Sequence, residues 1–135
     1  ILCDVNPFGI IATIAAYNDS GHWLDALRKY LWENYEYLCH FFEEHLPQYS
    51  VLPLEGTYLV WIDCRASGIG SDAITLRLQK EQKLLVNSGT MYGPGGEGFI
   101  RLNIACPRIL LADGLERILK YIRKHMRLLP HGKIR

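Results

Sequence analysis

The 135-residue sequence lacks an excess of charge of either sign. Fifteen Lys and Arg residues stand against fourteen Asp and Glu residues, which gives a formal net charge of +1. The sequence has no basic cluster beyond the Lys and Arg residues scattered along the predicted C-terminal helix, which we interpret as a solvated face. Proteins that bind nucleic acid or anionic membranes through charge carry a basic patch. Neither partner is therefore expected.

Long apolar runs are absent as well. A membrane-spanning helix needs about 20 consecutive apolar residues, and no run approaches that length, nor is a signal peptide visible at the start. The composition is nevertheless 49% hydrophobic, which is enough for a real core. A chain of 135 residues suits one domain or one and a half.

Cysteines are few and widely spaced: Cys3, Cys39, Cys64 and Cys106. Each lies in an apolar pattern, which favours reduced core thiols in a cytosolic protein over a disulfide framework. A metal centre is not indicated either, because His40 and Glu44 lie one helical turn apart without a third ligand in view.

A glycine-rich stretch matches the spacing of a nucleotide motif without its context. Gly93, Gly95 and Gly98 fit G-x-G-x-x-G, but the dinucleotide fingerprint requires a helix to begin at the turn. Here a strand is predicted to follow, and the sequence has no G-K-[ST] of a P-loop. The glycines are instead predicted to form a flexible or tightly turned connection, where glycine allows positive φ and close backbone approach.

Periodicity and capping residues predict two helices followed by a compact α/β unit. Asn6 caps a first helix that ends near Tyr17, and a second helix of about 25 residues ends before Pro47. The remaining predicted elements are strands Tyr49–Leu52, Thr57–Asp63, Leu84–Asn87 and Phe99–Ala105, a helix capped by Ser71 or Asp72 that ends near Gln82, and a last helix opened by Pro107. The buried stripe of the last helix is predicted to be Leu110, Leu111, Leu115, Ile118, Leu119 and Ile122.

Arg101 is the polar residue that the strand pattern singles out. Within Phe99–Ala105, Ile100, Leu102 and Ile104 take one face while Arg101 takes the other, so the arginine is expected on a half-buried strand. A guanidinium held there suits a planar anion, and a substrate carboxylate fits its fork of donors. An ion pair with a protein carboxylate is the alternative, and residue type alone favours that alternative.

Four blocks of sequence, taken in order, resemble one enzyme family. They are Asn6–Tyr17 (NPFGIIATIAAY), Trp23–Leu27 (WLDAL), Glu55–Asp63 (EGTYLVWID) and Met91–Arg108 (MYGPGGEGFIRLNIACPR). Together they look like the C-terminal third of a class I/II aminotransferase-fold enzyme of the cystathionine β-lyase or C–S lyase (MalY/PatB) type. The resemblance implies an α/β (α+β two-layer) small domain of the PLP-dependent transferase fold type I, with helices on a small, mostly antiparallel sheet.

The same resemblance implies pyridoxal 5′-phosphate (PLP), bound as a Schiff base to a lysine of a large domain. The expected serine-rich context surrounds none of the lysines here: Lys29, Lys80, Lys83, Lys120, Lys124 and Lys133. The chain is therefore expected to be a fragment that binds no cofactor or metal and has no activity alone. Residues 1–20 would end the large domain, 21–47 form a long interdomain helix, 48–127 form the small domain and 128–135 form a tail.

Particular residues acquire roles through the resemblance. Arg101 matches the family arginine that grips the substrate α-carboxylate, in agreement with its strand pattern. The turn Gly56-Thr57-Tyr58 and the loop Asn87-Ser88-Gly89 would line the pocket mouth, although an aromatic such as Tyr58 or Trp61 in a strand is usually core packing. Asn103 would either support Arg101 or be a core amide satisfied by backbone. The family loop usually has Pro-Gly at Ser88-Gly89, which leaves loop rigidity and substrate preference open.

We hypothesise that the parent protein is a cytosolic, homodimeric PLP enzyme that cleaves the C–S bond of cystathionine-like or cysteine-conjugate amino acids by β-elimination. An aminotransferase is the nearest alternative, because both activities begin with α-proton abstraction. A non-catalytic α/β module that binds a small carboxylate or another protein is the alternative of a different class. If a large domain exists, it would cover apolar residues of the first helix such as Ile10, Ile11 and Ile14.

Overall fold

The computed structural model describes residues 6–126, and the chain divides into two compact units at the junction of residues 33 and 34. Of the described residues, 6–33 belong to the first unit and 34–126 to the second. Cys3, Lys133 and the expected tail 128–135 lie outside the described residues.

The first unit consists of α1 (Pro7–Asp19) and the first half of α2 (Gly21–His45). Asn6 caps α1 as predicted, because its Oδ1 accepts a hydrogen bond of 2.9 Å from the N–H of Phe8. A proline occupies the first helical position. The predicted break between the two helices is confirmed at Ser20.

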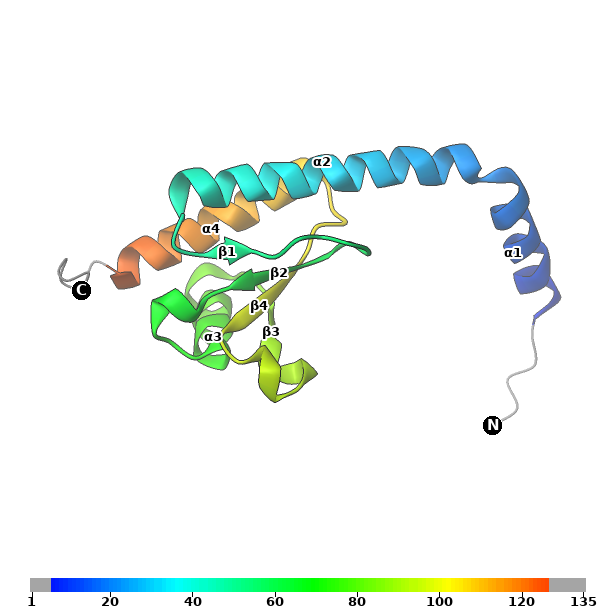
Figure 1. The fold of residues 1–135 in the computed structure, drawn as a ribbon. Coiled ribbons are helices and arrows are strands. Elements are labelled where there is room, and N and C mark those ends of the chain that lie inside the picture. Colours follow the sequence, from blue (N-terminus) through cyan, green and yellow to red (C-terminus); the bar gives the residue numbers. More distant parts are fainter. Residues whose placement is uncertain (1–5, 127–135) are drawn as a thin grey trace. The chain divides into compact units, whose positions relative to one another are not determined.

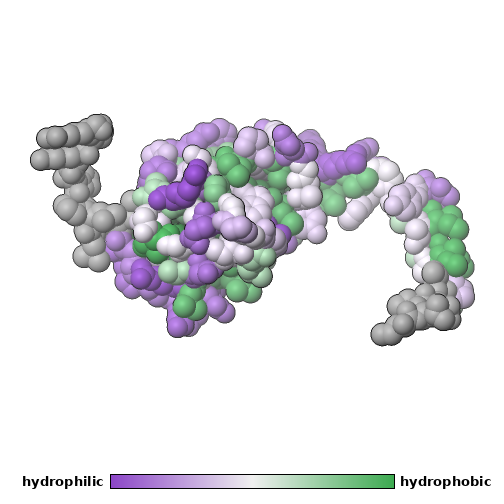
Figure 2. Space-filling view, turned by 60° about the horizontal axis from the view of Figure 1, so that its bottom comes forward, coloured by the Kyte–Doolittle hydropathy of each residue, from purple (hydrophilic) through white to green (hydrophobic). Residues whose placement is uncertain are grey.

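Helix α1 buries none of its side chains. Figure 2 shows hydrophobic surface gathered on this helix. The large apolar side chains that the unit exposes include Phe8, Ile10, Ile11, Ile14, Tyr17 and Trp23. Apolar surface of this extent normally marks a contact with other protein.

The second unit holds the rest of α2, two further α-helices and a four-stranded sheet (Figure 1), with short 3-10 helices at Arg65–Ser67, Gly89–Tyr92 and Pro94–Gly96. Its strands and α-helices after α2 are β1 (Ser50–Val51), β2 (Leu59–Asp63), α3 (Ser71–Gln82), β3 (Asn87–Ser88), β4 (Phe99–Asn103) and α4 (Arg108–Met126). The strand order is β1-β2-β4-β3, and every pairing is antiparallel. The predicted fold class is confirmed, although β3 begins at Asn87 rather than Leu84.

Four aliphatic side chains from the two central strands line one face of the sheet. The register pairs Val60 with Leu102 and Ile62 with Ile100, and all four side chains are buried. The residues that alternate with them, Arg101 included, are only partly buried or exposed. The alternation predicted for β4 is therefore confirmed.

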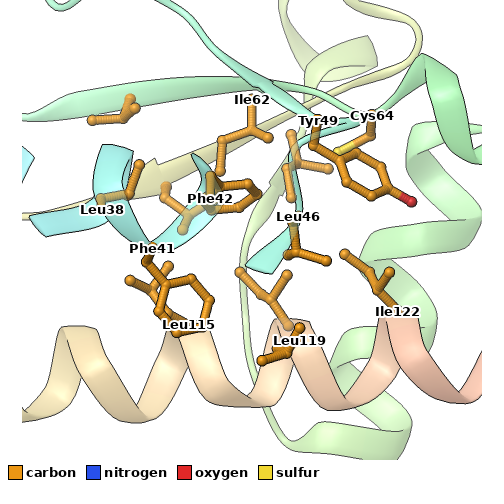
Figure 3. Packing of buried hydrophobic residues seen from close by; sticks show 14 of the residues in the cluster. Leu38, Phe41, Phe42, Leu46, Tyr49, Ile62, Cys64, Leu115, Leu119 and Ile122 are labelled. Carbon is orange, nitrogen blue, oxygen red and sulfur yellow. The ribbon is translucent and has the colours of Figure 1, made fainter. Parts of the chain in front are cut away.

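Helices pack on this apolar face and close the core. Figure 3 shows side chains of α2 meeting those of α4 beside the strands. The labelled members of the cluster are Leu38, Phe41, Phe42, Leu46, Tyr49, Ile62, Cys64, Leu115, Leu119 and Ile122. Buried side chains of α3 belong to the same cluster, so the second unit is a two-layer arrangement with one hydrophobic core.

The predicted buried stripe of α4 is wrong at one residue, Leu110. Leu110 is 60% exposed, whereas Leu111 is buried. Successive helical residues are rotated by about 100°, so a helix that turns Leu111 and the residues at three- and four-residue spacing after it inward leaves Leu110 facing outward. Tyr121 is buried on this helix instead.

The prediction that Ser71 or Asp72 caps α3 is also wrong. Gly70 is the N-cap residue, and Ser71 is the first helical residue and fully buried. The N–H of Ser71 donates to Oε1 of Glu97 at 3.0 Å. The cap is therefore supplied by a distant residue, which no local sequence pattern can reveal.

Asn34, the first residue of the second unit, ties α2 to the segment between β4 and α4. Its side chain is fully buried. Its Nδ2 donates to the carbonyl oxygens of Ile104 and Cys106 at 2.8 and 3.0 Å, and its Oδ1 accepts from Nε of Arg108 at 2.7 Å. A buried amide with its donors and acceptor paired fixes one geometry, because each lost bond would leave a polar group desolvated.

Three free cysteines lie among the described residues. Cys64 is buried, and burial raises the pKa of its thiol to about 12, while Cys39 and Cys106 are only partly buried. Within residues 6–126, no helix has both the length and the apolar character needed to cross a bilayer. Nor do these residues bring together three His, Cys, Asp or Glu side chains that could hold a metal ion.

Candidate carboxylate-binding site

Arg101 lies at the centre of a row of three residues that crosses the sheet. On one side its register partner is Trp61 of β2, and on the other side it is Asn87 of β3. All three belong to the face of the sheet opposite the apolar core, and all three are partly buried. Since directly paired residues on one face of a sheet lie close together, the row is a prebuilt cluster.

Tyr92 contacts all three members of this row. The Cζ atom of Arg101 lies 4.3 Å from the centre of the Tyr92 ring, which is a cation–π contact. The Trp61 ring meets the Tyr92 ring nearly edge-on, at 5.3 Å and 77°. Nδ2 of Asn87 donates to the hydroxyl of Tyr92 at 2.9 Å. The tyrosine is therefore held from two sides while it contacts the arginine.

The guanidinium of Arg101 makes no ion pair or hydrogen bond with another residue in the part of the chain that the structure describes. Asp63, on the same face of β2, is instead bound to Arg65, whose Nε donates to both carboxylate oxygens at 3.0 Å. These hydrogen bonds lower the pKa of the Asp63 carboxyl. Of the two partners considered for Arg101, a protein carboxylate is thus not bound to it within residues 6–126.

Glycines give the loop before β4 its close packing. Gly89 and Gly96 touch through their backbones, since a Cβ atom on Gly96 would lie 2.0 Å from the carbonyl oxygen of Gly89. Gly93 and Gly98 have φ values of 115° and 83°. The predicted close approach and positive φ are therefore confirmed in this loop.

Two acidic residues attach the loop to the start of α3. Oδ1 of Asp72 accepts from the hydroxyl of Thr90 at 2.5 Å, and hydrogen bonds from Ser88 and Thr90 lower the pKa of the Asp72 carboxyl. Oε1 of Glu97 accepts from the N–H groups of Ser71 and Gly98 at 3.0 and 3.1 Å. Tyr92 thus belongs to a loop anchored on both sides of it.

Of the other residues expected at the pocket, Asn87 is the register partner of Arg101 on β3, while the rest occupy other positions in the unit. Ser88 and Gly89 are buried, and Ser88 pairs with Ile100, which belongs to the core face of the sheet. Gly56, Thr57 and Tyr58 are exposed just before β2, at its end nearest Asn103. There Oγ1 of Thr57 accepts from the N–H of Leu59 at 3.2 Å.

Asn103 and Trp61 have surroundings that differ from the core expectation. Asn103 is exposed, and its Oδ1 accepts from the N–H of Ala105 at 2.8 Å, so its amide is satisfied by backbone as expected but outside the core. Trp61 is only partly buried and belongs to the face of Arg101. The strand alternation already contained this placement, because Trp61 is one residue from the buried Val60 and Ile62.

Comparison with known proteins identifies relatives along most of the chain. This chain is 40% identical over 114 residues to cystathionine beta-lyase PatB of Bacillus subtilis, and 37% identical over 122 residues to protein MalY of Escherichia coli. These alignments cover 84% and 90% of this chain, but only 30% and 31% of the relatives. No protein-family model matches the sequence. The chain thus spans about 30% of the length of these relatives.

A solved structure agrees with the sequence relatives. Cystalysin from Treponema denticola, whose crystal structure contains a pyridoxal 5′-phosphate cofactor, superposes with a TM-score of 0.85 at 31% identity. The match covers 90% of this chain and 31% of cystalysin. The fold expected from the sequence blocks is therefore found in a PLP-containing protein.

The contact between Gly89 and Gly96 predicts that two adjacent glycines differ sharply in their tolerance of alanine. Gly96→Ala places a methyl group against the Gly89 carbonyl and should lower the free energy of unfolding by about 1–3 kcal/mol. Gly95→Ala is the matched control, because nothing lies within 4 Å of its Cβ position, and should change that free energy by less than about 0.5 kcal/mol. Urea unfolding of both variants measures the difference. Equal midpoints and slopes would contradict the close packing of this loop.

Proposed function

We propose the function of this chain from its family and its site. The chain belongs to the cystathionine β-lyase and C–S lyase family of PLP-dependent, aminotransferase-fold enzymes, and it forms the C-terminal part of such an enzyme. In this proposal the second unit holds the α-carboxylate of an amino-acid substrate through Arg101. The parent enzyme would cleave the C–S bond of cystathionine-like or cysteine-conjugate amino acids. An aminotransferase stays the alternative, since it needs the same grip on the carboxylate.

The state of the Arg101 guanidinium is the observation that carries the proposal. It is partly buried on β4 and contacts the Tyr92 ring, and no acceptor among residues 6–126 takes its donors. A partly desolvated guanidinium without a protein acceptor is suited to a planar ligand anion, which it binds through two parallel N–H···O bonds. This combination favours a ligand role over a structural ion pair.

Such a grip would orient the substrate as well as bind it. Two bonds to one carboxylate fix a plane, whereas a single charge contact leaves the bound molecule free to rotate. Bond cleavage by the family cofactor depends on the angle at which the scissile bond is held, so orientation contributes to the rate and not only to affinity. What this chain contributes is thus the placement of the substrate.

The lysines among the described residues support a cofactor site elsewhere in the parent protein. Lys29, Lys80, Lys83, Lys120 and Lys124 are all exposed, whereas a lysine that bonds the cofactor covalently must lie in its pocket. We therefore propose that the rest of the parent protein supplies the PLP site. PLP supplies the electron sink of the reaction when it is bound there.

We further propose that residues 1–20 end a large domain, 21–47 form an interdomain helix and 48–127 form the small domain. The unburied apolar helix α1 supports this division, because a large domain of the same chain would cover it. Homodimerisation and residues donated by a second subunit belong to the same proposal. The free thiols fit a reducing compartment such as the cytoplasm.

Substitution of Arg101 tests the proposed role in the complete enzyme. Arg101→Lys keeps a positive charge but loses the fork of donors, so it should cost on the order of 2–5 kcal/mol of binding or transition-state stabilisation. The matched control Arg123→Lys changes an exposed arginine of α4 and should change kinetics little. Steady-state kinetics and the melting temperature are measured for both variants.

A ligand-binding arginine predicts that Arg101→Lys lowers kcat/KM while its melting temperature stays near that of the parent. Normal kinetics with a large loss of thermal stability would instead identify Arg101 as a structural ion-pair residue. That result would refute the assignment.

The proposed location of the PLP site gives a second test. The 135-residue chain, mixed with PLP and dialysed, should be colourless and should release no pyruvate from cystathionine, because the proposal assigns the lysine that holds the cofactor to the rest of the parent protein. An absorption band in the visible range that survives dialysis would contradict this division of labour.

A further inference from the structure

We infer that Tyr92 is the positioning residue for the Arg101 guanidinium, and that Asn87 in turn sets the position of the Tyr92 ring. This inference rests on the proposed function and adds to it a residue from the glycine-rich loop. Tyr92 itself need not touch the substrate. Its role is to restrict the orientations of an arginine that would otherwise lose its rotational freedom on binding the carboxylate.

A comparison of three arginines within the chain singles out this contact. Among the described residues, Arg65 lies over Phe99, Arg101 over Tyr92 and Arg108 over Tyr37. Arg65 also donates to Asp63, and Arg108 also donates to Asn34, so protein acceptors already fix both. Arg101 has the aromatic contact without such an acceptor.

The Tyr92 ring is well suited to this role because its own position is fixed. It is 46% exposed, yet its hydroxyl accepts from Asn87 and its ring packs against Trp61. Two residues before it, Thr90 is bound to Asp72 at the start of α3. A ring held by backbone-anchored neighbours can constrain a flexible side chain, whereas a mobile ring cannot.

Asn87 is placed so that it can position the Tyr92 ring relative to Arg101. Asn87 is the register partner of Arg101 on β3, and its amide reaches the hydroxyl of the ring that contacts Arg101. The antiparallel pairing of β3 with β4 therefore fixes the separation between Asn87, which binds the Tyr92 hydroxyl, and Arg101, which contacts the Tyr92 ring. Loss of the hydroxyl should loosen the ring without removing the cation–π contact.

Carboxylate selectivity in the complete enzyme tests the inference. The probe is S-ethyl-L-cysteine, compared with its α-carboxamide, and thiol release gives kcat and KM for each. Tyr92→Leu removes the ring and should reduce the preference for the carboxylate about three- to tenfold, mainly through KM, as expected for a partly exposed cation–π contact. Tyr92→Phe keeps the ring and should lose about twofold or less.

Two further variants separate positioning from general stability. Tyr37→Leu removes another Arg–Tyr contact of the same fold, so it should lower the melting temperature without changing the preference for the carboxylate. Asn87→Ala should reproduce the small effect of Tyr92→Phe, and the double variant should be no worse than either, because both changes remove the same hydrogen bond.

The outcomes distinguish this inference from the proposal on which it rests. If Arg101→Lys abolishes the preference for the carboxylate but Tyr92→Leu preserves it, Arg101 keeps its role and the positioning role of Tyr92 is refuted. If Arg101→Lys also preserves the preference, both proposals fall. Should Tyr92→Leu fail to fold, a loss of preference in Tyr92→Phe that equals the loss in Arg101→Lys would refute the ring contact as the operative interaction.

Discussion

The antiparallel pairing of β2 with β4 is the constraint on which the second unit depends. Five register pairs join Leu59–Asp63 to Phe99–Asn103, and the two-residue period of a strand gives each residue one of two faces. Val60 and Ile62 therefore enter the core, while Trp61 and Arg101 share the opposite face. A shift of one residue would exchange the two sets, so the burial of the aliphatic residues is also what positions the guanidinium.

Polar contacts over long sequence separations complete what the sheet begins. Asn34 joins α2 to the segment after β4, and Glu97 joins the glycine-rich loop to the start of α3. Each of these side chains satisfies backbone groups, so its loss would leave donors or acceptors unpaired. The loop that carries Tyr92 is consequently ordered by the body of the domain, which is how a loop residue comes to constrain the arginine of a strand.

Sequence patterns predict the features of this fold that depend on local chemistry. The cap at Asn6, the extent of α2 and the alternation around Arg101 each follow from neighbouring residues, and the ordered blocks identify the family. The patterns do not predict the contacts of Tyr92, because its position depends on a loop closed by glycines that meet in space. They do not predict the exposure of Leu110 either, because tertiary packing determines which face of α4 is buried.

The central claim is that Arg101 is a ligand-binding residue whose orientation is prepared by its aromatic neighbour. The most direct measurement is a crystal structure of the complete enzyme with a bound amino-acid inhibitor. We expect both α-carboxylate oxygens at about 2.7–2.9 Å from the donors of Arg101, with the Tyr92 ring still against the guanidinium. A carboxylate held by other residues, with Arg101 paired to an Asp or Glu of the protein, would contradict it.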